Sequence, residues 1–190
     1  PFIPGTEASG VIVEENCKNK NLINKRVIIN TKNNCFSEEI IIKLNDVFIL
    51  DEKFKLNYLE AASFYMATLT SYISLIETIK TRKNNNILIT GASGNIGQSF
   101  IQLSKYLGNK VISIVSNNKK KKLVDEIGSD YAIIKKNNIY KKIMQITKNK
   151  GVDTIIDING FLKEYNLLKT LKWNGNYLIL GFTDNNITSI

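Results

Sequence analysis

Apolar and polar positions alternate with a period of two along the amino-terminal part of the chain. The alternation runs through residues 8–13, 26–29 and 39–44. Clusters rich in Asn and Lys at 16–21 and 31–34 separate these segments, as turns separate strands. Because successive side chains of a strand point to opposite faces, the pattern predicts short antiparallel strands of a small β domain.

The spacing of apolar residues becomes helical from Met66 to Lys80. Residues 57–60 before it have the character of a helix start, and the polar stretch 83–86 after it is the expected junction between domains. Recurrence every three or four positions predicts a helix that links the two parts of the chain. The apolar positions are Leu69, Tyr72, Ile73, Ile76 and Ile79.

From Ile87 onward, short apolar runs alternate with helical patterns. The runs are almost continuously apolar, as in strands that are buried on both faces. Alternating strands and helices of this kind predict an α/β fold, with a parallel sheet covered by helices on both faces. Strands are expected near 87–91, 111–115, 131–134, 153–158 and 176–181, and helices near 95–107, 119–127, 138–148 and 162–171.

A glycine-rich turn, Gly91 to Gly97, follows the first of these runs. A strand, such a turn, a helix and a parallel strand form the unit that holds a dinucleotide pyrophosphate. Gly94 would let a phosphate approach the backbone, and Gly97 would let the helix pack tightly on the strand. The spacing is GxxGxxG rather than GxGxxG, so a turn in an α/β protein without nucleotide is the alternative. The residues expected to wrap the phosphates with backbone N–H groups are Ser93, Gly94, Asn95 and Ile96.

Composition narrows the classes of function. The 190 residues carry 26 Lys and Arg against 17 Asp and Glu, a net charge of +9. The Lys residues are spread along the chain and accompany many Asn and Ile, so we expect a compositional bias and no nucleic-acid partner. Only Lys119–Lys122 is dense, and it can be a solvated helix face or a phosphate contact. No apolar run could span a membrane, and a chain that opens on Pro1 without a signal peptide suggests a piece of a longer protein.

The small number of His and Cys residues excludes several classes of site within this segment. The sequence contains no His, and its two cysteines, Cys17 and Cys35, are far apart. A disulfide framework, a structural zinc cluster and catalysis by His are therefore not expected. Two reduced thiols in a cytoplasmic protein is the interpretation we favour.

Several segments together resemble the medium-chain dehydrogenase/reductase superfamily, and they cover essentially the whole chain in order. Residues 1–14 resemble its PxxPGxExxGxVxE segment, and residues 61–72 its AAxLPxxxLTAY helix. The turn at 91–97 is similar to GASGGVG, residues 151–157 to GVDxxxD, and residues 174–182 to the closing GGRxVxxGF.

Within that superfamily the chain is most similar to the zinc-free quinone oxidoreductases, the zeta-crystallin-like branch. Zinc-dependent alcohol dehydrogenases have His-Glu where this chain has Thr6-Glu7, and their Cys-rich lobe has no counterpart here. The resemblance implies a partial GroES-like catalytic β domain at 1–65, a linking helix at 66–83 and a Rossmann NADP-binding domain at 84–190 that lacks its last strands. No metal site is expected.

The resemblance also implies the cofactor. NAD-specific folds place Asp or Glu after the second strand, where it binds the ribose 2′-hydroxyl. This chain has Ser116 there, and Ser116 and Lys120 coincide with the SxxxK positions of relatives that use NADPH. Lys135 matches a position that contacts the same 2′-phosphate, and Gly181 and Phe182 belong to the closing cofactor-binding motif. NADPH is the predicted cofactor.

By resemblance, the reaction is hydride transfer from NADPH to a conjugated carbonyl compound, such as a quinone or an enone. Thr70 is expected to face the nicotinamide, the alternative being a helix-interior Thr bonded to the preceding turn. Tyr65 and Thr68 replace the family's Pro and Gly, which leaves the class of small-molecule substrate open. An enoyl-thioester reductase and a non-catalytic NADPH-binding protein are the alternatives. The resemblance further implies a cytoplasmic homodimer without membrane attachment.

Overall fold

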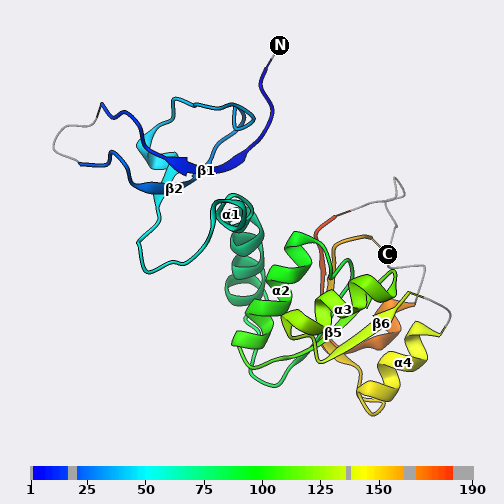
Figure 1. The fold of residues 1–190 in the computed structure, drawn as a ribbon. Helices are drawn as coiled ribbons and strands as arrows, with labels where there is room; N and C mark the ends of the chain where they lie inside the picture. Colours follow the sequence, from blue (N-terminus) through cyan, green and yellow to red (C-terminus); the bar gives the residue numbers. More distant parts are fainter. Residues whose placement is uncertain (1, 17–20, 136–137, 161–165, 182–190) are drawn as a thin grey trace. The chain divides into compact units, whose positions relative to one another are not determined.

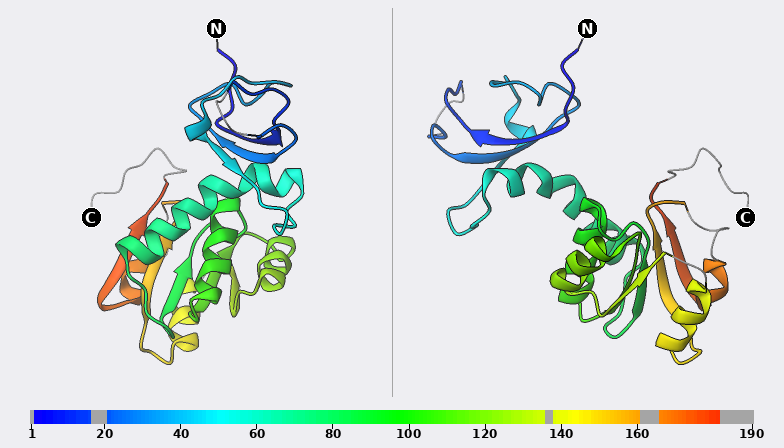
Figure 2. Two further views of the ribbon diagram at one scale, coloured as in Figure 1. Left: turned by 90° about the vertical axis from the view of Figure 1, so that its left-hand side faces the viewer. Right: turned by 45° about the vertical axis from the view of Figure 1, so that its right-hand side comes forward.

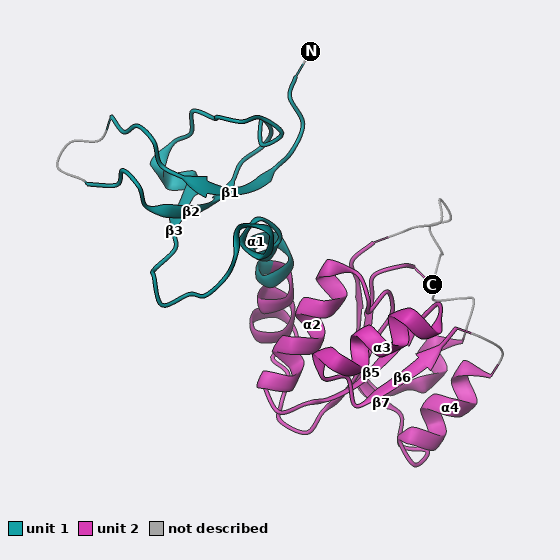
Figure 3. Cartoon of the chain, viewed as in Figure 1, with its two compact units in different colours: residues 1–69 teal, residues 70–190 magenta. Residues whose placement is uncertain are grey.

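The computed structural model describes residues 2–16, 21–135, 138–160 and 166–181. The chain divides into two compact units, residues 1–69 and residues 70–190 (Figure 3). Within the described residues, every helix is too short or too polar to cross a bilayer.

Unit 1 contains an antiparallel sheet in the order β1-β2-β3 (Figure 3). Its strands are β1 (Glu7–Val11), β2 (Arg26–Asn30) and β3 (Val47–Ile49). The central strand β2 buries three consecutive apolar residues, whereas many apolar side chains on the other elements of this unit are exposed. The predicted antiparallel strands at 8–13 and 26–29 are therefore present, with ends shifted by one or two residues.

The strand predicted at 39–44 is wrong. Residues 39–43 have no regular secondary structure, and a 3₁₀ turn follows at Leu44–Asp46. The edge of β2 that this segment would have used is paired with Val47–Ile49. An alternating segment forms a strand only where a neighbouring strand provides hydrogen-bond partners and its apolar side chains can be buried. Ile41, in the middle of this segment, is fully exposed.

Helix α1 (Tyr58–Tyr72) begins well before the linking helix expected from the periodicity, at the helix start that residues 57–60 indicate. The Asn57 side chain accepts a hydrogen bond from the Glu60 backbone N–H at 2.9 Å, and the Glu60 carboxylate accepts one from the Asn57 N–H at 2.8 Å. This reciprocal pair is a capping box, which satisfies backbone donors that a helix start leaves without partners. A π-helical segment, Ile73–Thr78, continues the helix, and the boundary between the units falls inside α1.

Unit 2 contains a parallel sheet in the order β6-β5-β4-β7-β8, so the chain winds outward from β4 in both directions (Figures 1 and 2). The strands are β4 (Asn86–Ile89), β5 (Lys110–Val115), β6 (Tyr131–Ile134), β7 (Val152–Asp157) and β8 (Leu171–Ile179). The helices between them are α2 (Asn95–Tyr106), α3 (Asn118–Ile127) and α4 (Ile139–Ile146).

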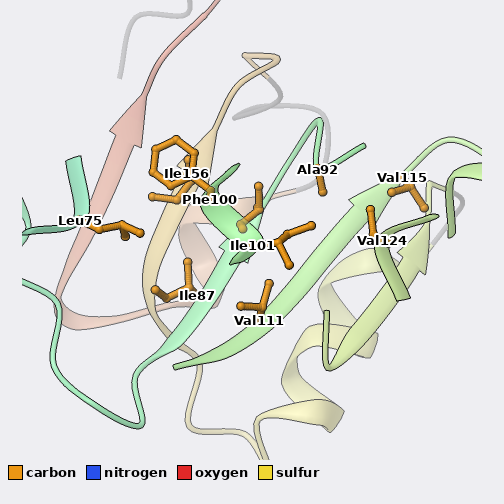
Figure 4. Packing of buried hydrophobic residues seen from close by; sticks show 10 residues of the cluster. Leu75, Ile87, Ala92, Phe100, Ile101, Val111, Val115, Val124 and Ile156 are labelled. Carbon is orange, nitrogen blue, oxygen red and sulfur yellow. The ribbon is translucent and has the colours of Figure 1, made fainter. Parts of the chain in front are cut away.

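Two apolar clusters cover the two faces of this sheet. Phe100 and Ile101 of α2 pack with Leu75 and Ile156 on one face, as Figure 4 shows. On the other face, Ile143 of α4 packs with residues such as Leu88, Ile112 and Ile155. The predicted α/β fold, a parallel sheet with helices on both faces, is confirmed.

The helix predicted at 162–171 is wrong over its described part, residues 166–171. Residues 161–165 lie outside the described residues. A 3₁₀ turn occupies Leu167–Thr170, and β8 begins directly after it, earlier than the expected residue 176. The pairing of β7 with β8 shifts register between Val152 and Thr154. A bulge of this kind lets β8 continue through an exposed, Gly-containing stretch that the alternation did not predict.

Candidate functional site

The carboxyl ends of the five parallel strands meet at one edge of the sheet in unit 2. The topological switch point lies at β4, because its neighbours β5 and β7 lead to opposite sides. In open α/β sheets, ligands bind at this carboxyl edge beside the switch point. The segment that follows β4 here is the glycine-rich turn.

The turn leads the chain into α2, and the start of this helix is exposed. Gly94 is the N-cap residue in an extended conformation, and its own N–H donates to the Gly91 carbonyl at 3.0 Å. No side chain caps this helix, and its first turn contains no acidic residue. Gly94 and Asn95 are exposed, with Ser93 and Ile96 half-buried beside them. The helix start therefore presents backbone donors and the positive end of its dipole to an anion.

The two glycines of the turn have different surroundings. A Cβ on Gly97 would lie 2.6 Å from the Gly91 carbonyl oxygen and 2.6 Å from Ala92 Cα, so this residue packs directly on the strand–turn backbone. A Cβ on Gly94 would meet only the Gly91 carbonyl oxygen, at 3.4 Å. The protein itself leaves room for a side chain at position 94. This space would admit a ligand close to the backbone.

The end of β5 presents a hydroxyl and two ammonium groups. Ser116 is exposed, and Asn117 caps α3 by accepting a hydrogen bond from the Lys120 N–H at 2.9 Å. Lys121 and Lys122 pair with Asp125 and Glu126 of their own helix, at 2.6 and 3.8 Å. Within the described residues, no ion pair joins Lys119 or Lys120 to an acid. The lysine run is therefore divided: its second half forms ion pairs along the helix, and its first half, exposed at the start of α3, has no acid partner within the described residues.

Further predicted residues follow the neighbouring strands. Lys135 follows β6 and donates its backbone N–H to Val115 at 2.7 Å, which holds it beside the end of β5. Gly181 comes just after β8, at the same carboxyl edge. Phe182 lies outside the described residues. The fold thus brings the turn, Ser116, Lys135 and Gly181 to one edge of one sheet.

Thr70 is half-buried and lies inside α1. Unlike the other predicted site residues, it does not follow a strand of the parallel sheet. Its neighbour Ser71 is buried and shares a hydrogen bond with Ser99 of α2 at 2.8 Å between the hydroxyl oxygens. This bond ties the second half of α1 to the helix that begins at the glycine turn.

A hydrogen-bonded polar cluster at the same edge, with Thr90 and Asp157 buried and Tyr177 half-buried, was missed by the sequence analysis. It consists of Asp157 at the end of β7, Thr90 at the end of β4 and Tyr177 of β8. Burial first, then the hydrogen bond to Asp157 and its negative charge, raise the pKa of Tyr177 well above its ordinary range, so the phenol donates. The available signal was a single acid ending the apolar run of β7.

The residues that the structure describes do not fit a zinc ion. Thr6 offers no nitrogen ligand, and the Glu7 carboxylate accepts a hydrogen bond from the Met66 backbone N–H at 2.8 Å. Burial first, and then the charge of Glu7, raise the pKa of the Cys35 thiol, which disfavours the thiolate that zinc binds. In the described ranges, no three His, Cys, Asp or Glu residues lie close enough to hold a metal.

Comparison with known proteins places these features in a family. Residues 95–190, half of the chain, match the family model described as zinc-binding dehydrogenase. A quinone oxidoreductase-like protein 2 homolog of Nematostella vectensis is 28% identical over 100% of this chain. A highly reducing polyketide synthase, sor1, of Hypocrea jecorina is 28% identical over 96% of the chain.

Among solved structures, a putative NADPH:quinone reductase from Bacillus thuringiensis superimposes with a TM-score of 0.85 at 27% identity over 96% of the chain. The chain spans 52% of the Nematostella protein, 55% of the Bacillus chain and 7% of the polyketide synthase. The chain thus spans about half the length of these two relatives.

Proposed function

The chain belongs to the zinc-binding dehydrogenase family, in the quinone oxidoreductase branch of the medium-chain dehydrogenases/reductases, and from this membership we propose a zinc-independent NADPH:quinone or enone oxidoreductase. The observation that carries the proposal is the exposed α2 start, where Gly94 has space for a side chain and yet has none. A backbone cradle of this kind suits a pyrophosphate.

The residues of the turn would bind and orient the dinucleotide. The N–H groups of Ser93, Asn95 and Ile96 would donate to the pyrophosphate, Gly94 would let a phosphate approach the backbone, and the dipole of α2 would offset the charge. NADPH, when bound, supplies the hydride. The protein's contribution would be orientation of the two reactants and exclusion of water. Thr70 would lie against the nicotinamide.

The preference for NADPH over NADH would come from the end of β5. Ser116 in place of an acid removes a charge that would repel a 2′-phosphate, and Lys120 adds one that attracts it. The division of the lysine run supports this role, because Lys120 has no acid partner within the described residues. Lys135, beside the end of β5, would add a third contact, and Gly181 and Phe182 would border the cofactor on the side of β8.

Zinc independence rests on the chemistry of unit 1. The sequence has no His, and Glu7 already accepts a backbone N–H. Activation of a carbonyl by a bound metal ion is therefore not part of the proposed reaction. The homodimer and the cytoplasmic location that the family resemblance implies stay predictions.

An enoyl-thioester reductase is the second candidate. The similarity to a highly reducing polyketide synthase over 96% of the chain favours it. Both candidates transfer a hydride to a conjugated carbonyl, and they differ in the acceptor. A non-catalytic NADPH-binding protein is the third alternative, and it would share the nucleotide site without turnover.

Oxidation of NADPH by the purified full-length protein tests the proposal. The acceptors to compare are 1,4-benzoquinone, 9,10-phenanthrenequinone, an open-chain enone and the N-acetylcysteamine thioester of crotonate. Turnover with the quinones or the enone supports the first candidate, and turnover with the thioester alone supports the second. NADPH binding without turnover of any acceptor would mean the non-catalytic class, and absence of NADPH binding would refute all three.

A further inference from the structure

The buried carboxylate of Asp157 organises the loop that follows β7. Its Oδ1 accepts hydrogen bonds from the backbone N–H groups of Gly160 at 2.9 Å and Asn159 at 3.2 Å. The same oxygen accepts from the Thr90 hydroxyl at 2.6 Å, and Oδ2 accepts from the Tyr177 phenol. Asp157 thus joins the ends of three neighbouring strands, β4, β7 and β8.

Thr90 extends this network to the first residue of the loop. Its hydroxyl oxygen accepts from the Ile158 N–H at 3.0 Å and lies 3.4 Å from the Asn159 nitrogen. Each backbone N–H from 158 to 160 is therefore bonded to Asp157 or to Thr90. Side chains at the ends of β4 and β7 therefore set the path of this loop.

The loop 158–160 passes between two glycines of the candidate site. Gly91 has a φ of +60°, and a Cβ there would lie 2.2 Å from the Asn159 Oδ1 atom. A Cβ on Gly181 would lie 2.7 Å from the Ile158 carbonyl oxygen. Both glycines are thus needed so that this loop can approach, and the loop in turn forms one side of the turn between β4 and α2.

The other acids that join strands in this unit differ from Asp157. Asp153, at the opposite end of β7, pairs with Lys172 at 2.7 Å and accepts the Asn86 N–H. Asp130 pairs with Lys105 in the same way and accepts the Val111 N–H. Asp157 is fully buried, and its described partners are neutral donors. Burying a carboxylate without a cation is costly, so a sheet would be joined more cheaply by apolar packing.

We propose that Asp157 is a positioning residue of the nucleotide site: with Thr90 and Tyr177, it holds the loop 158–160 against Gly91, beside the turn that would receive the nicotinamide and pyrophosphate half of NADPH. This inference rests on the proposed function. The adenosine half, which would bind at Ser116 and Lys120 beyond β5, lies outside the network.

The experiment compares two ligands and three variants of the full-length protein. Asp157→Asn keeps the shape of the side chain but replaces an acceptor by a donor, and Tyr177→Phe removes one donor and keeps the ring. Asp153→Asn is the matched control on the same strand. Dissociation constants are measured by fluorescence or calorimetry for NADPH and for adenosine 2′,5′-bisphosphate, with the melting temperature of each variant recorded alongside.

Asp157→Asn should raise the dissociation constant of NADPH about ten- to a hundredfold, the range for loss of a charged hydrogen-bond partner. Its affinity for adenosine 2′,5′-bisphosphate should not change. Tyr177→Phe should produce a smaller change in the same direction, and it replaces Asp157→Asn if that variant does not fold. Asp153→Asn should lower the melting temperature and leave both affinities as in the wild type.

Three outcomes would overturn the inference. One is unchanged NADPH affinity in the folded Asp157 or Tyr177 variants. Another is an equal loss of both ligands, which would indicate a general structural effect. The third is a wild-type protein that binds neither ligand, and only this result would remove the proposed function as well.

Discussion

In the parallel sheet of unit 2, the charged residues at the amino ends of the strands differ in their partners from those at the carboxyl ends. We call these two ends the amino edge and the carboxyl edge. At the amino edge, Asp130 and Asp153 each pair with a Lys and accept the N–H of a residue at the start of a strand. At the carboxyl edge, Lys119 and Lys120 are without acid partners among the described residues, the α2 start is uncapped by a side chain, and Gly94 leaves space. The two acids at the amino edge are paired within the protein, and the carboxyl edge has lysines and a helix start that could receive a ligand.

The largest effect is expected from a side chain at position 94. Gly94→Val should abolish NADPH binding with little change in melting temperature, because the protein leaves room there and a phosphate would not. Titration of NADPH into the full-length variant measures this. Native affinity in Gly94→Val would mean that the turn is only structural, and the carboxyl edge would then not differ from the amino edge.

Gly97→Val is the matched control for that substitution. Its Cβ would lie 2.6 Å from backbone atoms of Gly91 and Ala92. Overpacking of this kind costs about 1–3 kcal/mol. We therefore expect a lower free energy of unfolding in denaturant titration as well as weaker NADPH binding. If Gly97→Val were as stable as the wild type, the tight helix–strand packing inferred at this turn would be wrong.

The next largest effect concerns cofactor preference. The wild type should bind NADPH more tightly than NADH by about ten- to a hundredfold, the contribution of one charge-assisted contact to the 2′-phosphate. Ser116→Asp should reverse the preference, and Lys120→Ala should reduce it. Fluorescence titration with both cofactors measures each ratio.

Lys122→Ala tests whether the preference for NADPH comes from a local contact of Lys120 or from the net positive charge of the lysine run. Lys122 lies on the same helix as Lys120 and pairs with Glu126. The variant should keep the wild-type ratio of NADPH to NADH affinity. An equal fall in Lys120→Ala and Lys122→Ala would show that the lysine run acts only through its net charge.

A smaller effect should follow from Asp130→Asn at the amino edge. Asp130 lies 2.7 Å from Lys105 Nζ and accepts the Val111 N–H at 2.7 Å, but it is partly exposed. Partly exposed ion pairs contribute about 1 kcal/mol or less. We expect a melting temperature lower by a few degrees in calorimetry and unchanged NADPH affinity. Loss of NADPH affinity in this variant would contradict the division of roles between the edges.

Removal of metal should have no effect. Among the described residues of both units, no three metal-binding side chains lie close together. EDTA or 1,10-phenanthroline should leave NADPH oxidation unchanged, and elemental analysis of the full-length protein should find no stoichiometric zinc. One zinc per chain would instead move the protein toward the alcohol dehydrogenases.

Much of the fold was predictable because its signals are local. The apolar runs of β4, β5 and β6 and the helices between them lie close to their expected residues. The predictions are wrong where an alternating segment has no neighbouring strand to pair with, or where a bulge shifts the register between strands. The segment at 39–44 alternates like a strand but has no regular structure, and residues 167–170 form only a 3₁₀ turn.

The candidate site was predictable only in part. Ser93, Gly94, Asn95 and Ile96 lie in one short segment, so the glycine spacing together with the flanking strand and helix patterns was enough to predict a phosphate turn there. Asp157, Thr90 and Tyr177 could not be connected from the sequence, because 67 residues separate Thr90 from Asp157 and 20 separate Asp157 from Tyr177. Hydrogen bonds over such separations follow from the strand order β4-β7-β8, which periodicity does not determine.

The sequence by itself determined the alternation of strands and helices, the position of the glycine turn and the absence of His ligands. These depend on the side-chain period and on backbone sterics, which act over a few residues. Only the tertiary structure decided what each glycine accommodates: Gly97 packs on its own turn, Gly91 and Gly181 admit the loop after β7, and Gly94 contacts almost nothing. The sequence shows only that a position is Gly. Which atoms a side chain there would meet depends on how the strands have paired and on which distant parts of the chain come close.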